Sequence, residues 1–161
     1  MPTGFQGFSG KSFINYNALS FSKVEAVVVS GDGPNLCGHM MLRVDNYYFH
    51  ISGVYNYPMY MMAAQFDAYL KQNRKTELFR TRRILRNRNA ARDKLKILLS
   101  EKWLWLIIPN NCTDFVEEVI GAGENDFGLI SNCPTQLSIK IQQEIRRRKM
   151  VLTRRGYRAR R

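Results

Sequence analysis

The sequence lacks the features that mark membrane-spanning, secreted or disulfide-stapled proteins. No apolar run is long enough to cross a bilayer, and the first residues lack the charged start, apolar stretch and cleavage site of a secretory signal. The three cysteines are an odd number without framework spacing, which argues against disulfide stapling and predicts at least one free thiol. We therefore expect synthesis in the cytoplasm without a signal peptide, with any export left to a dedicated secretion system.

Acidic residues are also few, and the charge is unevenly distributed. The chain has 25 Lys and Arg against 13 Asp and Glu, a net charge of +12. Residues 146–161 carry +9 and residues 74–96 carry +8, which leaves −5 for the remainder. Such basic segments favour anionic partners, namely nucleic acid, a membrane surface, an anionic cell-wall polymer or an acidic protein. A purely solvating role is an equal alternative.

The length and the hydrophobic pattern predict one mixed α+β domain. With 161 residues, 45% of them hydrophobic, the chain can bury one substantial core, which we place in residues 1–145 with residues 146–161 as a basic tail. The expected strands are residues 24–30, the two arms of a hairpin around Asp45-Asn46, residues 77–85 and residues 137–141. The expected helices are residues 62–70, one capped by Asn89 that buries Ala91, Leu95, Leu98 and Leu99, and one capped by Asn111 that ends at Gly121 or Gly123.

The chain contains two histidines, and the predicted hairpin places both on one face of the sheet. If Asp45-Asn46 is a two-residue turn, His39 and His50 are diagonal neighbours on adjacent strands, with backbones roughly 7 Å apart. The opposite face then carries only apolar or aromatic side chains, which supports this register: Met40, Leu42, Val44, Tyr47, Phe49 and Ile51. Two imidazoles also fit a purely structural role, so a third partner must decide whether they perform chemistry.

Cys112 is the candidate third partner, because it opens the helix capped by Asn111. It shares the apolar face of that helix, while Asp114, Glu117 and Glu118 are expected to point to solvent. In the first helical turn, free backbone N–H groups and the helix dipole favour a thiolate and can stabilise an oxyanion. A buried cysteine that merely packs as a small hydrophobic side chain is the simpler alternative.

The order of these residues resembles that of the circularly permuted papain-like thiol proteins, the permuted NlpC-type and lecithin:retinol acyltransferase-like group. The matching stretches are GHMML with His39, YYFHIS with His50, and NNCTDFVEEV with Cys112, and the resemblance covers residues 24–123. It implies an antiparallel sheet packed against the helix of Cys112, with Cys112 as nucleophile, His39 as general base and His50 as its orienting partner. The candidate substrate-binding residues are Asn111, Tyr48 and Cys37.

This resemblance implies a cysteine hydrolase that forms a thioester acyl-enzyme and needs neither a cofactor nor a metal. The group includes amidases and endopeptidases that cleave bacterial cell-wall peptides, and also lipid acyl hydrolases and acyltransferases. The stretch NNCTDFVEEVIGAGENDFGLISNCP is more similar to the bacterial domains, among them secreted antibacterial effectors that act on a target-cell envelope. We therefore expect a cell-wall peptide as substrate and an acyl lipid as the alternative. An effector would also have an immunity protein or a secretion carrier as partner.

Other functions remain open at this stage. Cys37, His39, His50 and Cys112 are residue types that bind zinc, although a pair of closely spaced cysteines is missing. A non-enzymatic module could use the basic segments to bind phosphates, with nucleic acid as the less favoured partner. The Met/Tyr/Phe-rich stretch 55–66 could line an acyl channel, but ordinary core packing explains it more simply. Cys133 has no assigned role.

Overall fold

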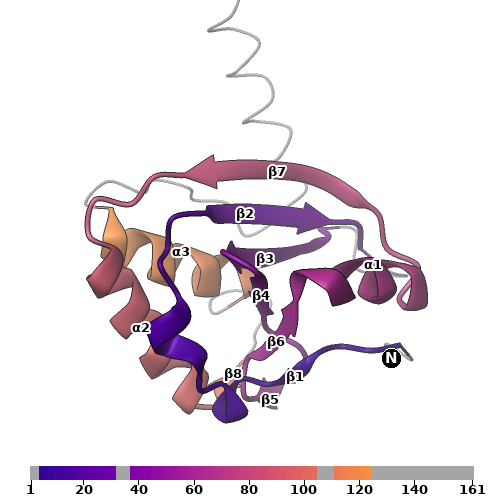
Figure 1. Cartoon of the computed structure of the whole chain (residues 1–161). Coiled ribbons are helices and arrows are strands. Elements are labelled where there is room, and N and C mark those ends of the chain that lie inside the picture. The colour runs from indigo at the N-terminus through magenta and orange to yellow at the C-terminus, as the bar shows by residue number, and fades with distance from the viewer. Residues whose placement is uncertain (1–3, 32–36, 105–110, 125–161) are drawn as a thin grey trace, which may run out of the picture.

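The computed structural model describes residues 4–31, 37–104 and 111–124. These residues form eight strands, two short 3-10 helices and three α-helices, shown in Figure 1. In chain order the elements are β1 (Phe8–Ser9), η1 (Gly10–Ser12), η2 (Asn15–Ala18), β2 (Val24–Val29), β3 (His39–Val44), β4 (Tyr47–His50), β5 (Tyr55–Asn56), β6 (Met59–Met62), α1 (Ala63–Gln72), β7 (Glu77–Arg83), α2 (Arg88–Ser100), β8 (Trp103–Leu104) and α3 (Cys112–Gly123).

Six of these strands form one antiparallel sheet in the order β1-β6-β4-β3-β2-β7. The remaining two strands, β5 and β8, pair with each other in a separate antiparallel ribbon. All six residues of β2 are buried, as expected for a strand with neighbours on both sides and side chains packed on both faces. The predicted mixed α+β class with an antiparallel sheet is confirmed.

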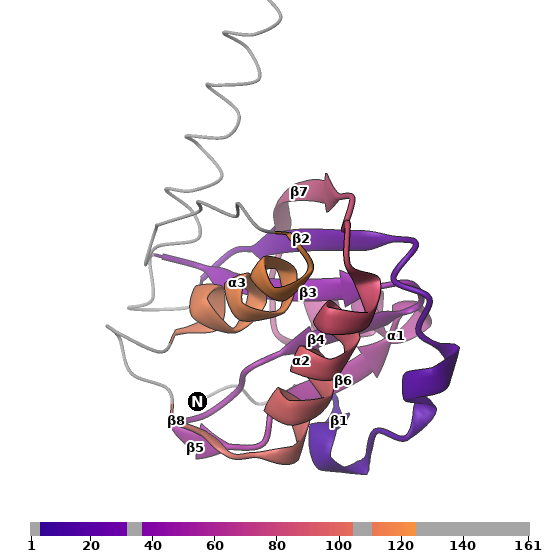
Figure 2. The same cartoon turned by 90° about the vertical axis from the view of Figure 1, so that its left-hand side faces the viewer.

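Helices cover both faces of the sheet. The even-numbered side chains of β2 belong to a core that includes residues of α2 and α3, whereas Val27 and Val29 pack with Phe66 and Tyr69 of α1. Figure 1 shows α2 and α3 on one side of the sheet and α1 on the other, and Figure 2 shows α2 and α3 crossing over the same face. The alternation of side chains along the central strands therefore divides their buried apolar residues between two cores.

The hairpin between β3 and β4 has the predicted two-residue turn. Val44 pairs with Tyr47 and Leu42 with Phe49, and Asp45 takes a positive φ of 50°. The six side chains predicted to share the apolar face all pack there, in the core with α2 and α3. The pairing of β3 with β4 ends at Leu42–Phe49, so the further pairs expected toward His39 and His50 do not form.

The helix and strand limits differ from the predicted ones by a few residues. Helix α2 is capped by Asn87, whose side chain accepts a hydrogen bond from the N–H of Ala90, and not by Asn89. Either Asn satisfies the preference for this position, so the sequence alone could not choose between them. Strand β7 ends at Arg83 and α1 continues to Gln72. The buried face predicted for α2 is confirmed, while the expected strand at 137–141 and the tail at 146–161 lie outside the described residues.

No helix in the described ranges combines the length and the apolar character that a membrane span requires.

Candidate active site

Cys112 is the first residue of α3, and the cap that precedes it fixes this helix end. The side chain of Asn111 accepts hydrogen bonds from the N–H groups of Thr113 and Asp114, at 2.8 and 3.2 Å. The Asp114 carboxylate in turn accepts from the N–H of Asn111, which completes a capping box. This cap uses the N–H groups of Thr113 and Asp114 and not that of Cys112. Asn111 is itself buried, so its observed role is to hold the helix start.

The thiol of Cys112 touches the strand that carries His39. The backbone N–H of Met40 donates to Cys112 Sγ at 3.4 Å, so the peptide between His39 and Met40 lies against the sulfur. This contact forms beyond the last pair of the β3–β4 ladder, Leu42–Phe49. Cys112 therefore lies at a helix start, against the backbone of the strand that carries His39.

The two histidines form a hydrogen-bonded chain that ends on a backbone carbonyl. His39 Nε2 lies 2.9 Å from His50 Nδ1, and His50 Nε2 lies 2.7 Å from the carbonyl oxygen of Gln6. Because a carbonyl oxygen can only accept, His50 Nε2 carries a proton, and in neutral His50 the Nδ1 atom must accept. His39 Nε2–H is then the donor, which places the lone pair of neutral His39 on Nδ1. Nδ1 is thus the nitrogen of His39 that can accept a proton, although burial disfavours the charged ring.

Burial keeps both imidazoles neutral. It lowers the pKa of His50 from 6.5 to about 4, against the raising effect of its hydrogen bond to Gln6, and nearby Lys75 lowers it further. The pKa of His39 lies well below its ordinary value, because of burial first and then the charges of His50 and Lys75. His50 is almost completely enclosed, whereas His39 is only half-buried. Both rings are therefore uncharged near neutral pH.

Burial also raises the pKa of the Cys112 thiol, although the backbone N–H groups of Met40, Cys112 and Thr113 act in the opposite direction. The helix start was expected to favour a thiolate, and in the folded protein desolvation outweighs this effect. The thiol of Cys112 and the imidazole of His39 are thus both uncharged near neutral pH.

Two groups that support His50 carry no signal in the sequence. The Gln6 carbonyl belongs to an N-terminal segment that is tied to the end of α1, since Asn73 donates to the carbonyl of Phe5 at 2.8 Å. The ring of Tyr69 meets His50 edge to face, with centroids 5.5 Å apart. A backbone carbonyl has no residue-type signature, and a tyrosine inside an amphipathic helix looks like ordinary core, so sequence patterns do not identify either.

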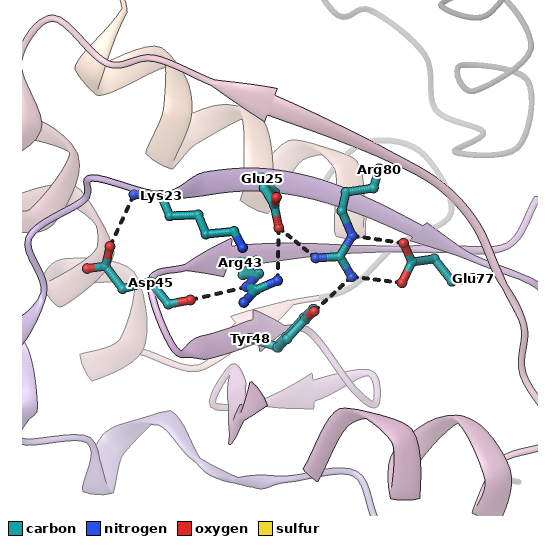
Figure 3. Close-up of polar contacts among 7 residues, drawn as sticks. All are labelled: Lys23, Glu25, Arg43, Asp45, Tyr48, Glu77 and Arg80. Atoms are coloured by element: carbon teal, nitrogen blue, oxygen red, sulfur yellow. Dashed lines mark hydrogen bonds and ion pairs between the residues drawn. The ribbon is translucent and has the colours of Figure 1, made fainter. Parts of the chain in front are cut away.

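Tyr48, a candidate substrate-binding residue, is enclosed in a charge network on the α1 side of the sheet. Its ring stacks on Phe66 with centroids 4.2 Å apart, and its hydroxyl accepts from Arg80 at 2.8 Å. Figure 3 shows Arg80 between Tyr48, Glu77 and Glu25, with Arg43 also on Glu25. Tyr48 is 2% exposed, so the structure does not bring it to the thiol and imidazole pair as a substrate contact.

Cys37 is disulfide-bonded, and Cys112 is the free cysteine among the described residues. The expectation that the chain lacks disulfides is wrong, because an odd cysteine count excludes only complete pairing. A disulfide sulfur cannot supply a thiolate ligand, so Cys37, His39, His50 and Cys112 do not assemble as the zinc site considered above. Within the described ranges no group of three or more His, Cys, Asp or Glu side chains could hold a metal ion.

Several basic side chains of residues 74–96 are already engaged inside the protein. Arg80 forms ion pairs with Glu25 and Glu77, and Arg92 donates to the carbonyl of Leu19 at 2.7 Å. Such internal contacts reduce the number of charges that this segment can offer to phosphates.

Glu117 was expected to point to solvent, but it is half-buried, and burial together with Asp114 raises its pKa to about 7.

No protein-family model matches the chain, and no curated protein or solved structure is significantly similar to it. The resemblance to permuted papain-like proteins therefore rests on the sequence motifs around His39, His50 and Cys112.

Proposed function

We propose that this protein is a cysteine hydrolase that works through a thioester acyl-enzyme. One observation carries the proposal: the Met40 N–H contacts Cys112 Sγ, while the neighbouring His39 is oriented by His50 and the Gln6 carbonyl. A nucleophile, a base and a group that orients the base are the minimum set for this chemistry. The hydrogen-bonded chain from His39 to Gln6 also defines which imidazole nitrogen can act.

In the first half-reaction, Cys112 attacks the substrate carbonyl and transfers its thiol proton to Nδ1 of His39. The N–H groups of Met40 and Cys112 flank the sulfur and are the natural donors to the oxyanion of the tetrahedral intermediate. Collapse breaks the bond to the leaving group, which takes the proton from His39, and leaves a thioester on Cys112. Water then attacks the thioester with His39 as base, and the thiol is restored.

His50 acts on His39 and not on substrate. Its Nδ1 accepts from His39 Nε2, so it holds the ring in place and stabilises the imidazolium that forms during attack. An uncharged orienting residue stabilises that cation less than a carboxylate would. Burial, which disfavours charge on both rings, raises the cost of the same step.

As substrate we propose an amide of bacterial cell-wall peptides, as in an antibacterial effector delivered to a target-cell envelope. An acyl lipid is the second candidate, because the same thioester chemistry cleaves esters and an exposed apolar ribbon, described below, suits a lipid surface. The internal contacts of Arg80 and Arg92 count against a phosphate-binding module as the main function.

The test is the rate at which an activated acyl ester modifies each cysteine, read by mass spectrometry near neutral pH. We expect Cys112 to be acylated, and His39→Ala to slow this step by on the order of 10²-fold, because the proton acceptor is lost. Tyr48→Phe is the matched control, since it removes a hydroxyl that binds Arg80 away from the thiol. Equal rates in wild type and His39→Ala would refute the proposed base.

Substrate class is then decided with purified cell-wall peptides and with phospholipid vesicles, in wild type and Cys112→Ala. Amide cleavage that depends on Cys112 supports a peptidase, whereas release of fatty acid from the vesicles supports a lipid hydrolase. Neither outcome affects the acylation test, which reports on Cys112 and His39 and not on the natural substrate.

A further inference from the structure

The β5–β8 ribbon buries Trp103 and exposes its other three residues, Tyr55, Asn56 and Leu104. Trp103, which pairs with Asn56, is buried and meets the Phe115 ring of α3 edge to face at 5.8 Å. The next pair, Tyr55 with Leu104, lies on the opposite face, and these side chains are 59% and 47% exposed. Val54, which precedes Tyr55, is 63% exposed. The ribbon is thus fixed to the core through Trp103 and presents a small apolar surface outward.

Lysines border this surface and lie over its tyrosine rings. Lys102 Nζ is 5.1 Å from the centre of the Tyr55 ring, and Lys11 Nζ of η1 is 5.2 Å from that of Tyr57. Both lysines are exposed. A lysine on a ring can stay there while its ammonium group reaches outward, because its long aliphatic chain covers apolar surface and its head remains in water.

We propose that the exposed side chains of Tyr55 and Leu104 in the β5–β8 ribbon, together with Val54 just before it and the flanking Lys102 and Lys11, dock on an anionic lipid surface. Tyrosine favours the boundary between the apolar and polar layers of a membrane, where its ring is buried and its hydroxyl stays hydrated. Leu104 and Val54 supply side chains for insertion, and the two lysines supply contacts to anionic headgroups.

The size of the surface favours a membrane over a protein partner. A stable protein interface needs about 800 Å² from each partner, more than these few side chains can supply. A bilayer needs only a shallow anchor, because the attraction of a basic protein to anionic lipids adds to the apolar contact. The net charge of +12 provides that attraction.

The two strands of the ribbon are also neighbours in the chain of the elements that carry His50 and Cys112. In the chain, β5 follows the strand of His50, and β8 precedes the helix of Cys112. Figure 2 shows the ribbon at the corner of the molecule below α3, apart from the six-stranded sheet. Docking here goes beyond the proposed hydrolysis and does not depend on it, because no part of the argument uses the thiol.

The test is sedimentation of the full chain with vesicles that mix phosphatidylcholine and phosphatidylglycerol, and with vesicles of pure phosphatidylcholine. Wild type should bind the mixed vesicles. The double variant Tyr55→Ser/Leu104→Ser should lower the partition coefficient by about tenfold or more, because both apolar contacts are lost. The double variant Lys11→Gln/Lys102→Gln should lower it by on the order of tenfold on mixed vesicles only.

Each variant has a matched control elsewhere on the surface. Leu78→Ser/Ile84→Ser removes two apolar side chains that are 42% and 77% exposed, in β7 and just after it, at the opposite edge of the molecule in Figure 1. Lys23→Gln/Lys71→Gln removes the same charge from exposed positions outside the ribbon. Both controls should keep the wild-type partition within roughly twofold, since neither touches the proposed surface.

Insertion is tested separately by fluorescence. Tyr55→Trp should be quenched by lipids brominated on their acyl chains, beyond the quenching seen in wild type, and Leu78→Trp should not. The proposal is overturned if wild type does not bind mixed vesicles, if the control variants lose as much binding as the ribbon variants, or if the tryptophan at position 55 is not quenched. In the second case the basic segments alone would explain attraction to the membrane.

Discussion

Acid should destabilise the protein through the buried imidazole pair, and His50 allows the size of the effect to be calculated. In the folded protein its pKa falls from 6.5 to about 4, mainly because burial disfavours the charged ring. Between these values the unfolded chain binds a proton that the folded protein does not. The stabilising contribution is therefore present above the ordinary pKa and is lost as the pH falls toward 4.

The magnitude follows from linkage. A pKa of 6.5 in the unfolded chain and about 4 in the folded protein corresponds to a loss of about 2 kcal/mol in unfolding free energy between about pH 7 and about pH 4.5. Glu117 acts in the opposite direction, because its raised pKa lets the folded protein take up a proton over part of the same range. Its half-exposed position makes that contribution smaller.

The assay is urea unfolding at the two pH values in wild type and His50→Gln. The glutamine keeps a polar side chain at the position but does not titrate, and the contribution of Glu117 cancels because both proteins contain it. Wild type should lose about 2 kcal/mol more than the variant as the pH is lowered. A parallel loss in both proteins would show that His50 is not held neutral, and the proton chain derived for His39 would then fail.

Two further perturbations test the surroundings of the site. Asn111→Ala should cost about 1–2 kcal/mol and slow acylation of Cys112, because the cap positions the helix start, whereas Asn87→Ala should cost a similar amount at α2 and leave the acylation rate unchanged. Glu25→Ala should cost about 3 kcal/mol in a urea titration, because two partly buried arginines lose their shared carboxylate. The exposed pair of Glu118 with Lys94 is the control, and Glu118→Ala should cost below about 1 kcal/mol.

The relation between the two histidines could be predicted because it depends on local rules. A two-residue turn and strict alternation fix the register of a hairpin, and any slip would have moved His39 or His50 into an apolar layer.

The contacts of the Asp45 side chain are a feature that the sequence did not reveal. Its carboxylate accepts from the N–H groups of Ser20, Phe21 and Lys23, which ties the turn to the preceding loop and lowers the pKa of Asp45 despite partial burial.

The remaining features depend on contacts between distant parts of the chain. The Gln6 carbonyl, far from the histidines in sequence, determines the tautomer of the pair. The disulfide at Cys37 could not be inferred, because cysteine spacing carries no information on which side chains meet. The direction of the Cys112 pKa shift was missed for a related reason: a helix start is visible in the sequence, whereas the depth at which the thiol is buried is not.

The contact between Cys112 and Met40 forms where β3 and β4 separate, while β3 stays paired with β2. His39 and His50 lie on the α1 side of the strands, while Cys112 packs in the core on the α2 and α3 side. A continuous β3–β4 ladder would keep the thiol and the imidazoles on opposite faces. The ladder ends at Leu42–Phe49, and beyond it the Met40 N–H bonds to the sulfur. The early end of this ladder, which looks like an irregularity in the hairpin, is therefore the feature that lets the thiol of Cys112 reach the backbone of the strand that carries His39.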